Sequence, residues 1–278
     1  MAKRWFITGA SRGFGREFAR AALQRGDRVA ATARDDSALS ELADEFGDEF
    51  VGLQLDVTDR EAVFATVQRA HEELGALDVV VNNAGYGLFG AVEEITEQQL
   101  RDQLEVNLFG VFHVTQAAIP FLRRQGRGHI VQISTIGGVA AFPNLGGYHA
   151  SKWALEGLSE SLAQEVAGFG IRVTLVEPGP FGTDWAGSSA VRAAAQPEYD
   201  RLREAQAEQS AGMPPELSGD PAAAARALLK LADAEEPPLR VFFGTLPTMI
   251  APPLYQDRLA TWDTWKDLSI EANGHGPA

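Results

Sequence analysis

Short, nearly all-apolar runs alternate along the chain with stretches in which apolar residues recur every three or four positions. The first pattern is typical of buried parallel strands, and the second of helices that pack one face against a sheet. The predicted strands are Arg4–Thr8, Arg28–Thr32, Val51–Leu55, Leu77–Val81, His129–Ile133, Arg172–Val176 and Arg240–Phe243. The predicted helices are Gly13–Arg25, Ser37–Phe46, Arg60–Leu74, Glu97–Arg124, His149–Ala167 and Pro221–Leu231. This alternation predicts one α/β domain over residues 1–278, doubly wound, with a parallel sheet and helices on both faces.

The alternation loosens after the sixth strand. Residues 182–219 are rich in Ala, Ser, Gly and Pro and have only patchy helical character. They follow a strand end, where ligands bind in doubly wound sheets, so we expect a substrate lid there. The tail, residues 244–278, carries four prolines and two tryptophans, and its pattern predicts no particular structure. Ser37, Asp59 and Asp220 are expected to cap the helices that follow them.

Composition narrows the functional classes. A hydrophobic fraction of 45% with 22% charged residues is typical of a globular protein. The chain has no cysteine, which excludes disulfides, thiolate metal sites and cysteine nucleophiles. Its net charge of −14 argues against a nucleic-acid partner. No run reaches the ~18 apolar residues of a membrane helix or the ~7 of a signal-peptide core. We therefore expect a cytoplasmic protein with no membrane partner.

A glycine-rich turn joins the first strand to the first helix. Glycine allows the tight backbone angles of such a turn, and the helix N-terminus presents free N–H groups to a phosphate. Its position in the first βαβ unit predicts a dinucleotide site, although the G-x₃-G-x-G spacing differs from the general fingerprint. The residues expected to hold the cofactor here are Gly9, Ser11, Arg12, Gly13, Phe14 and Gly15.

The end of the second strand bears on which dinucleotide binds. NAD sites usually place a carboxylate there for the ribose 2′-hydroxyl. This strand instead ends at Arg34, and Asp35 and Asp36 follow in the predicted loop. Arg34, helped by Arg12, is suited to bind the 2′-phosphate of NADP. Two solvated surface arginines are the alternative, and we favour NADP(H) over NAD(H).

Further short motifs follow the glycine-rich turn in order along the chain. Together with Thr8–Gly15 they are Asp56-Val57, Asn82-Asn83-Ala84-Gly85, Asn107, Tyr148-His149-Ala150-Ser151-Lys152, and Pro178-Gly179 with Thr183. In these motifs the chain resembles the short-chain dehydrogenase/reductase family, a group with a Rossmann-type fold, over most of its length up to about Phe243. The sequence near the fourth, fifth and sixth strands is similar to that of the hydroxysteroid and retinol dehydrogenases of this family. The resemblance implies that Asp56 and Val57 lie beside the adenine. It also implies that Asn83, Ala84, Gly85, Pro178, Gly179 and Thr183 lie around the nicotinamide end.

The expected catalytic residues are Asn107, Thr135, Tyr148 and Lys152. Tyr148 and Lys152 are four residues apart, so on a helix they share one face. A neighbouring ammonium and the positive nicotinamide ring favour the phenolate, so we expect a lowered pKa for Tyr148 and assign it proton transfer. The resemblance implies that Lys152 also binds the nicotinamide ribose and that Asn107 holds a water connecting Lys152 to solvent.

The fourth catalytic position departs from the family pattern. The family usually has a serine thirteen residues before the tyrosine, and Thr135 stands there. Ser134 is adjacent, but neighbouring side chains on a strand point to opposite faces. We favour Thr135, whose hydroxyl can still hydrogen-bond the reacting oxygen.

These features predict an NADP(H)-dependent oxidoreductase that interconverts a secondary alcohol and a ketone or aldehyde. An apolar small-molecule substrate, no metal site, and a homodimer or homotetramer are expected. Trp185, Trp262 and Trp265 are expected to anchor the lid and tail, with an apolar substrate pocket as the alternative. A non-catalytic NADP sensor or scaffold, and a redox-neutral epimerase or dehydratase, remain alternative functions on this fold.

Overall fold

Seven short strands pair into one fully parallel sheet in the order β3-β2-β1-β4-β6-β7-β9. The computed structural model describes residues 2–274. The strands are β1 Arg4–Ile7, β2 Arg28–Ala33, β3 Phe50–Gln54, β4 Val79–Asn82, β6 Gly128–Ile133, β7 Ile171–Pro178 and β9 Arg240–Phe243. The order reverses between β1 and β4, which opens a crevice at their carboxyl ends. The predicted doubly wound fold is confirmed.

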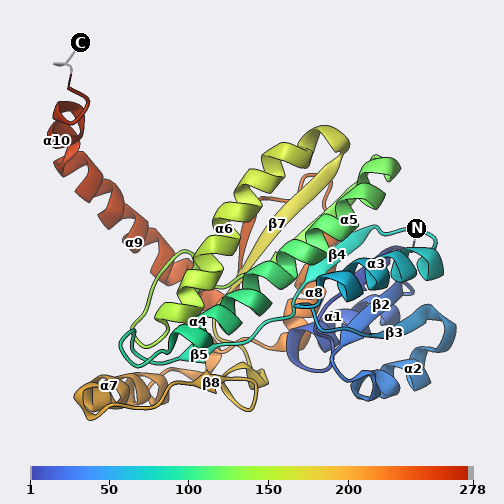
Figure 1. Ribbon diagram of the computed structural model, residues 1–278, viewed down its shortest axis with the longest axis horizontal. Coiled ribbons are helices and arrows are strands. Elements are labelled where there is room, and N and C mark those ends of the chain that lie inside the picture. Colours follow the sequence, from blue (N-terminus) through green and yellow to red (C-terminus); the bar gives the residue numbers. More distant parts are fainter. Residues whose placement is uncertain (1, 275–278) are drawn as a thin grey trace.

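Helices cover both faces of the sheet (Figure 1). They are α1 Gly13–Gln24, α2 Ser40–Phe46, α3 Arg60–Leu74, α4 Glu97–Leu104, α5 Val111–Gln125, α6 Gly146–Val166 and α8 Pro221–Asp233. Alternate residues of β1 divide the core: Trp5 and Ile7 pack with α1, α2 and α8, whereas Phe6 packs with α3, α5 and α6. This central strand is therefore buried on both sides, which explains its almost unbroken apolar sequence.

Three predicted helices begin or run differently from the sequence expectation. The predicted helix Ser37–Phe46 begins with a 3₁₀ turn, Asp36–Leu39, which precedes α2. Asp35, not Ser37, caps this turn: its carboxylate accepts from Ser37 N. The expected helix 97–124 is divided by a π-helical turn, Glu105–Gly110. The helix α6 begins three residues earlier than predicted, which brings Tyr148 into its first turn. The predicted caps Asp59 and Asp220 are confirmed.

Residues 182–219, the segment expected to be a lid and called the lid below, are built from short pieces. Beside 3₁₀ turns the lid contains β8 Val191–Arg192, which pairs with β5 Leu88–Phe89, and helix α7 Asp200–Ala211. The described part of the tail, up to residue 274, is largely helical: α9 Thr245–Thr264 and α10 Lys266–Glu271 extend away from the body (Figure 1). Residues 275–278 of the predicted tail lie outside the described residues. The first part of α9 packs through Ile250, Ala251 and Leu254 against the loop after β6. Between residues 2 and 274, no helix has the length and apolarity needed to cross a membrane.

One buried histidine makes stability depend on pH. Thr174 Oγ1 donates to Pro238 O at 2.7 Å, so its oxygen accepts from His129 Nε2 at 3.0 Å. Burial, then the charges of Lys3 and Arg172, lower the pKa of His129 from 6.5 to about 4. The unfolded chain therefore binds more protons between these pH values, and stability falls as pH drops from 6.5 toward 4.

We expect this residue to account for about 3 kcal/mol of the loss at the acidic end of that range. His129→Gln keeps a donor for Thr174 and should flatten the dependence. Denaturant unfolding at pH 7 and pH 4.5 measures it. An unchanged pH dependence in the variant would contradict the assignment.

Candidate functional site

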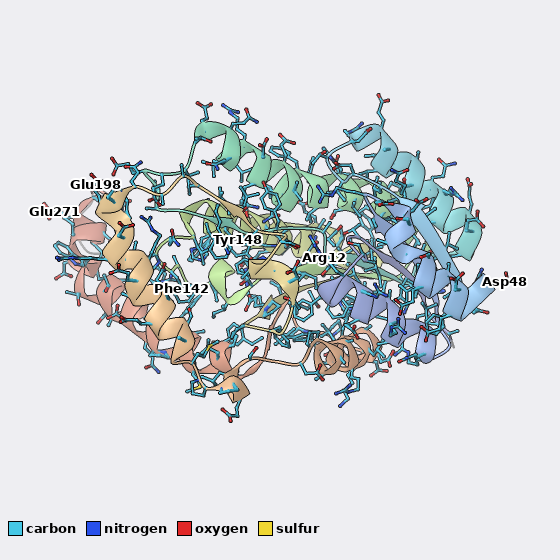
Figure 2. All side chains as sticks on the ribbon, turned by 90° about the horizontal axis from the view of Figure 1, so that it is seen from below. Arg12, Asp48, Phe142, Tyr148, Glu198 and Glu271 are labelled. Carbon is cyan, nitrogen blue, oxygen red and sulfur yellow. The ribbon has the colours of Figure 1, made fainter. Side chains whose placement is uncertain are left out.

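A cavity of about 920 Å³ runs along the carboxyl ends of the strands, from the turn after β1 to the lid. Arg12 and Tyr148, which both line it, lie near the middle of the molecule in the view of Figure 2. Apart from Gly15 and Asn107, every residue that the sequence analysis assigns to the site lines this cavity. The fold thus brings together positions spread from residue 9 to residue 183.

The glycine-rich turn has the geometry of a phosphate cradle. Gly9 and Gly13 have φ values of +69° and +56°, in the left-handed region that favours glycine. A Cβ at Gly15 would lie 2.4 Å from Gly9 O, so this glycine allows close packing rather than lining the cavity. The N-cap residue of α1, Arg12, makes no side-chain capping bond. The first N–H groups of α1 are thus left for an anion, which fits the phosphates of a dinucleotide.

Asn83 holds this turn against β4. Its Nδ2 donates to Thr8 O and Gly9 O, each at 3.0 Å. In return, Thr8 Oγ1 accepts from the backbone N–H groups of Asn83 and Ala84 at 3.0 and 3.1 Å. The side chain of Asn83 therefore supports the shape of the cradle.

The tip of β2 presents an arginine to the cavity. Arg34 is exposed, lines the cavity and makes no ion pair within residues 2–274. Asp35 turns aside, and its carboxylate accepts from Ser37 N at 3.0 Å. Hydrogen bonds from the side chain and then the backbone of Ser37 lower the pKa of Asp35. Asp56, on the adjoining loop, accepts from Thr58 N and Oγ1 at 3.0 and 2.8 Å.

The second arginine is engaged elsewhere. Arg12 Nη1 lies 3.1 Å from Asp184 Oδ2 and 2.9 Å from Ser188 Oγ, both in the lid. In this conformation Arg12 links the glycine-rich turn to the lid. Its expected help to Arg34 in binding a 2′-phosphate stays a prediction. Sequence reasoning missed Asp184 and Ser188 because they lie more than 170 residues away along the chain.

The predicted proton-transfer pair projects from successive turns of α6. Tyr148 and Lys152 are each only 6% exposed, and Lys152 Nζ lies 5.9 Å from the centroid of the Tyr148 ring. Lys152 Nζ also donates to Ile133 O at 2.8 Å. Burial lowers the pKa of Lys152 to about 8, although the charge of Glu156 opposes this.

The pKa of Tyr148 shifts in the direction opposite to the expectation. Burial raises it, and a hydrogen bond with the Thr135 side chain offsets only part of the rise. A neutral phenol is favoured in so apolar a site. The expected lowering relied in part on the positive charge of an oxidised nicotinamide ring.

Thr135 and Ser134 point to different sides of the loop that follows β6. Thr135 bonds Tyr148, and its Oγ1 also accepts from Gly137 N at 3.1 Å. Ser134 Oγ lies instead against Gly138, together with Glu156 Oε1. Their separation follows from the alternation of side chains along extended backbone.

Asn107 lies fully buried in the π-helical turn, outside the cavity lining. Its Oδ1 accepts from Tyr86 N at 3.1 Å, while its Nδ2 donates to Tyr86 O at 3.0 Å and to Ser151 Oγ at 3.2 Å. Both amide hydrogens are thus used by the protein itself. Asn107 clamps the loop after β4 against α6, and its role in holding a water stays a prediction.

An aromatic wall closes the lid end of the cavity. The Trp185 ring packs on Tyr148 at 5.0 Å and on Phe89 at 5.3 Å between centroids. A Cβ at Gly87 would lie 2.6 Å from Trp185 Cζ2, so glycine there makes room for the indole. Trp185 therefore lines the pocket, the alternative that the sequence analysis had placed second.

The far side of the cavity is shaped by the end of β7. Gly179 N donates to Phe243 O at 2.9 Å, and a Cβ at Gly179 would lie 2.7 Å from Pro247 Cδ. Thr183 follows, close to the glycine-rich turn: a Cβ at Gly13 would lie 3.7 Å from its Cβ. These contacts bring Pro178, Gly179 and Thr183 to the cavity from a segment remote in sequence.

Comparisons with known proteins identify the family of this chain. The family described as short chain dehydrogenase matches residues 3–193. Oxidoreductase BOA17 of Botryotinia fuckeliana is 43% identical over 271 residues, covering 97% of this chain and 99% of that protein. A crystal structure of a short-chain dehydrogenase from Streptomyces avermitilis superposes with a TM-score of 0.90 at 39% identity, covering 98% of both chains. An alcohol dehydrogenase from Thermococcus sibiricus, complexed with 5-hydroxy-NADP, has a TM-score of 0.74 at 28% identity, covering 89% of this chain and 98% of that one. The chain belongs to the short-chain dehydrogenase family of oxidoreductases.

Proposed function

We propose that this protein is an NADP(H)-dependent oxidoreductase that interconverts a secondary alcohol and a ketone or aldehyde, with Tyr148 as general acid and base. The observation that carries the proposal is a single cavity lined by Tyr148, Thr135, Lys152 and the glycine-rich turn. A proton-transfer group and a phosphate cradle on one cavity are what hydride transfer to a carbonyl needs.

In the reduction direction, Tyr148 donates its phenolic proton to the carbonyl oxygen. Burial raises the pKa of Tyr148, so the phenol holds this proton at neutral pH. Thr135 shares a hydrogen bond with Tyr148 and is suited to hold the same oxygen. The Lys152 ammonium stabilises the phenolate that remains, and a bound nicotinamide cofactor supplies the hydride. In the oxidation direction Tyr148 takes the alcohol proton.

The preference for NADP(H) over NAD(H) rests on Arg34. Its guanidinium lines the cavity at the tip of β2, where a carboxylate would favour NAD, and neither Asp35 nor Asp36 lines the cavity. The 5-hydroxy-NADP in the Thermococcus sibiricus relative is consistent with this choice. Release of Arg12 from Asp184 would add a second cation for the same phosphate.

The substrate is proposed to be an apolar small molecule. The cavity beside Tyr148 is walled by Trp185, Phe89, Phe142 and Leu145, which favour an aromatic or aliphatic body over a charged one. A homodimer or homotetramer and a cytoplasmic location remain part of the proposal and rest on the family resemblance and the sequence.

The test is to measure initial rates of NADPH and NADH oxidation over a panel of apolar and polar ketones and aldehydes. We expect turnover with NADPH and apolar carbonyls. Arg34→Ala should reduce kcat/KM for NADPH by about 10- to 100-fold, the value of a charge-assisted hydrogen bond, with little effect on NADH. Arg226→Ala, at an exposed position of helix α8, is the matched control.

Equal use of both cofactors, unchanged in Arg34→Ala, would contradict the NADP assignment. Tight NADPH binding without turnover over the whole panel would contradict the oxidoreductase and favour a sensor. Substrate conversion with no net change in the cofactor's redox state would favour an epimerase or dehydratase.

A further inference from the structure

Two buried carboxyl groups and a partly exposed guanidinium lie behind the catalytic residues. Glu156 on α6 is 5% exposed and Glu177 on β7 is 1% exposed. Arg240 on β9 places Nε 3.0 Å from Glu156 Oε2 and 3.6 Å from Glu177 Oε1, and its Nη2 donates to Glu160 Oε2 at 2.8 Å. Removing a charged group from water costs several kcal/mol of desolvation free energy per ion, so this cluster by itself opposes folding.

The cluster borders the catalytic lysine. Glu156 follows Lys152 by one helical turn, on the same face of α6. Lys152 Nζ bonds Ile133 O, the last residue of β6. Ser134 directly follows Ile133. A Cβ placed on Gly138 would lie 2.6 Å from Ser134 Oγ and 2.8 Å from Glu156 Oε1, so these two side chains lie together against Gly138. The side chains of Lys152 and Glu156 thus lie beside two consecutive residues, Ile133 and Ser134.

Two cations, Lys152 and Arg240, lie near three carboxyl groups, those of Glu156, Glu160 and Glu177, so the charges balance when one carboxyl group holds a proton. Burial and then the charge of Glu156 raise the pKa of Glu177 to about 8, while Arg240 opposes the rise. Glu177 therefore holds the proton at neutral pH. Burial raises the pKa of Glu156 as well, while Ser134 and the two cations Arg240 and Lys152 oppose this rise and favour its carboxylate form. Tyr148, on the same helix, is a further titratable group beside the lysine.

We propose that Glu156, anchored by Arg240, is a positioning residue that keeps the buried Lys152 in its ammonium form so that Lys152 can support proton transfer by Tyr148. The part of this inference that concerns proton transfer by Tyr148 rests on the proposed function. The charge relation between Glu156 and Lys152 can be measured without turnover.

Removing the negative charge should make the ammonium harder to maintain. In Glu156→Gln the Lys152 side chain should titrate at lower pH than in the wild type, by about one unit. The alkaline limb of kcat/KM should shift in the same direction, with activity about fivefold lower at pH 8 relative to pH 6 than in the wild type. A merely structural role would lower activity equally at both pH values.

Glu160→Gln is the matched control. Glu160 lies one turn further along α6 and also bonds Arg240, but its side chain is 54% exposed. Its loss should leave both the Lys152 titration and the pH profile as in the wild type. Glu156→Asp keeps the charge and should restore much of the wild-type profile.

The direct measurement is an NMR titration of protein labelled at lysine carbons. The chain has only four lysines, and Lys152→Met assigns the buried one. We expect wild-type Lys152 to be charged at pH 7 and to titrate near the pKa of about 8 given above. A wild-type Lys152 already neutral at pH 7 would overturn the proposal, whether or not the Glu156 variants fold. So would equal Lys152 titrations in the wild type and Glu156→Gln. Because this signal needs no substrate, failure of the proposed function would appear separately, as absent turnover.

Discussion

Tyr148→Phe should lower kcat for carbonyl reduction by about 10²- to 10⁴-fold, the usual contribution of a positioned proton donor. The change removes only the phenolic hydroxyl and leaves the ring that packs on Trp185. Thr135 loses one hydrogen-bond partner but keeps its bond from Gly137 N. The cavity should therefore retain its shape, and NADPH affinity should change little. Steady-state rates together with NADPH fluorescence titration separate the two effects.

Tyr255→Phe provides the control, because Tyr255 lies exposed on α9, away from the cavity lining. It should match the wild type in both measurements. If turnover survived in Tyr148→Phe, the acid–base assignment would be wrong and another group would have to supply the proton.

Lys152→Met should lower kcat/KM by about 10²-fold or more, because the phenolate at Tyr148 would lose its nearby positive charge. Its effect on stability should be small. Burial lowers the pKa of Lys152 to about 8, which means that the ammonium is disfavoured in the folded protein. Methionine fills much of the same space, and the main penalty is the loss of the partner of Ile133 O, about 1–3 kcal/mol. Removal of the buried charge offsets part of it.

Rate measurements should thus show that this variant has lost most of its activity, whereas denaturant unfolding should show that it has kept most of its stability. Lys230→Met, on the exposed side of α8, should change neither. A loss of activity that merely tracked a large loss of stability would show that Lys152 acts through the fold and not through the reaction.

Local sequence patterns predicted most of the architecture. The apolar runs marked every strand of the main sheet within a few residues, since parallel strands are buried on both faces. Caps at Asp59 and Asp220 were also predictable, because a cap acts within three residues of its own position. The tail was not. Pro252 and Pro253 argue against a helix interior, yet α9 forms while its first turns pack on the loop after β6.

The sequence by itself determined the family, the turn of Gly9, Gly13 and Gly15, and the spacing of Tyr148 and Lys152. These depend on residues close together along the chain, where backbone geometry fixes which side chains share a face. Only the tertiary structure decided that Arg12 meets Asp184, that Trp185 packs on Tyr148, and that two buried carboxylates lie behind the lysine. Those contacts join segments from distant parts of the chain. Their charges and burial arise only when the sheet and its helices exclude water.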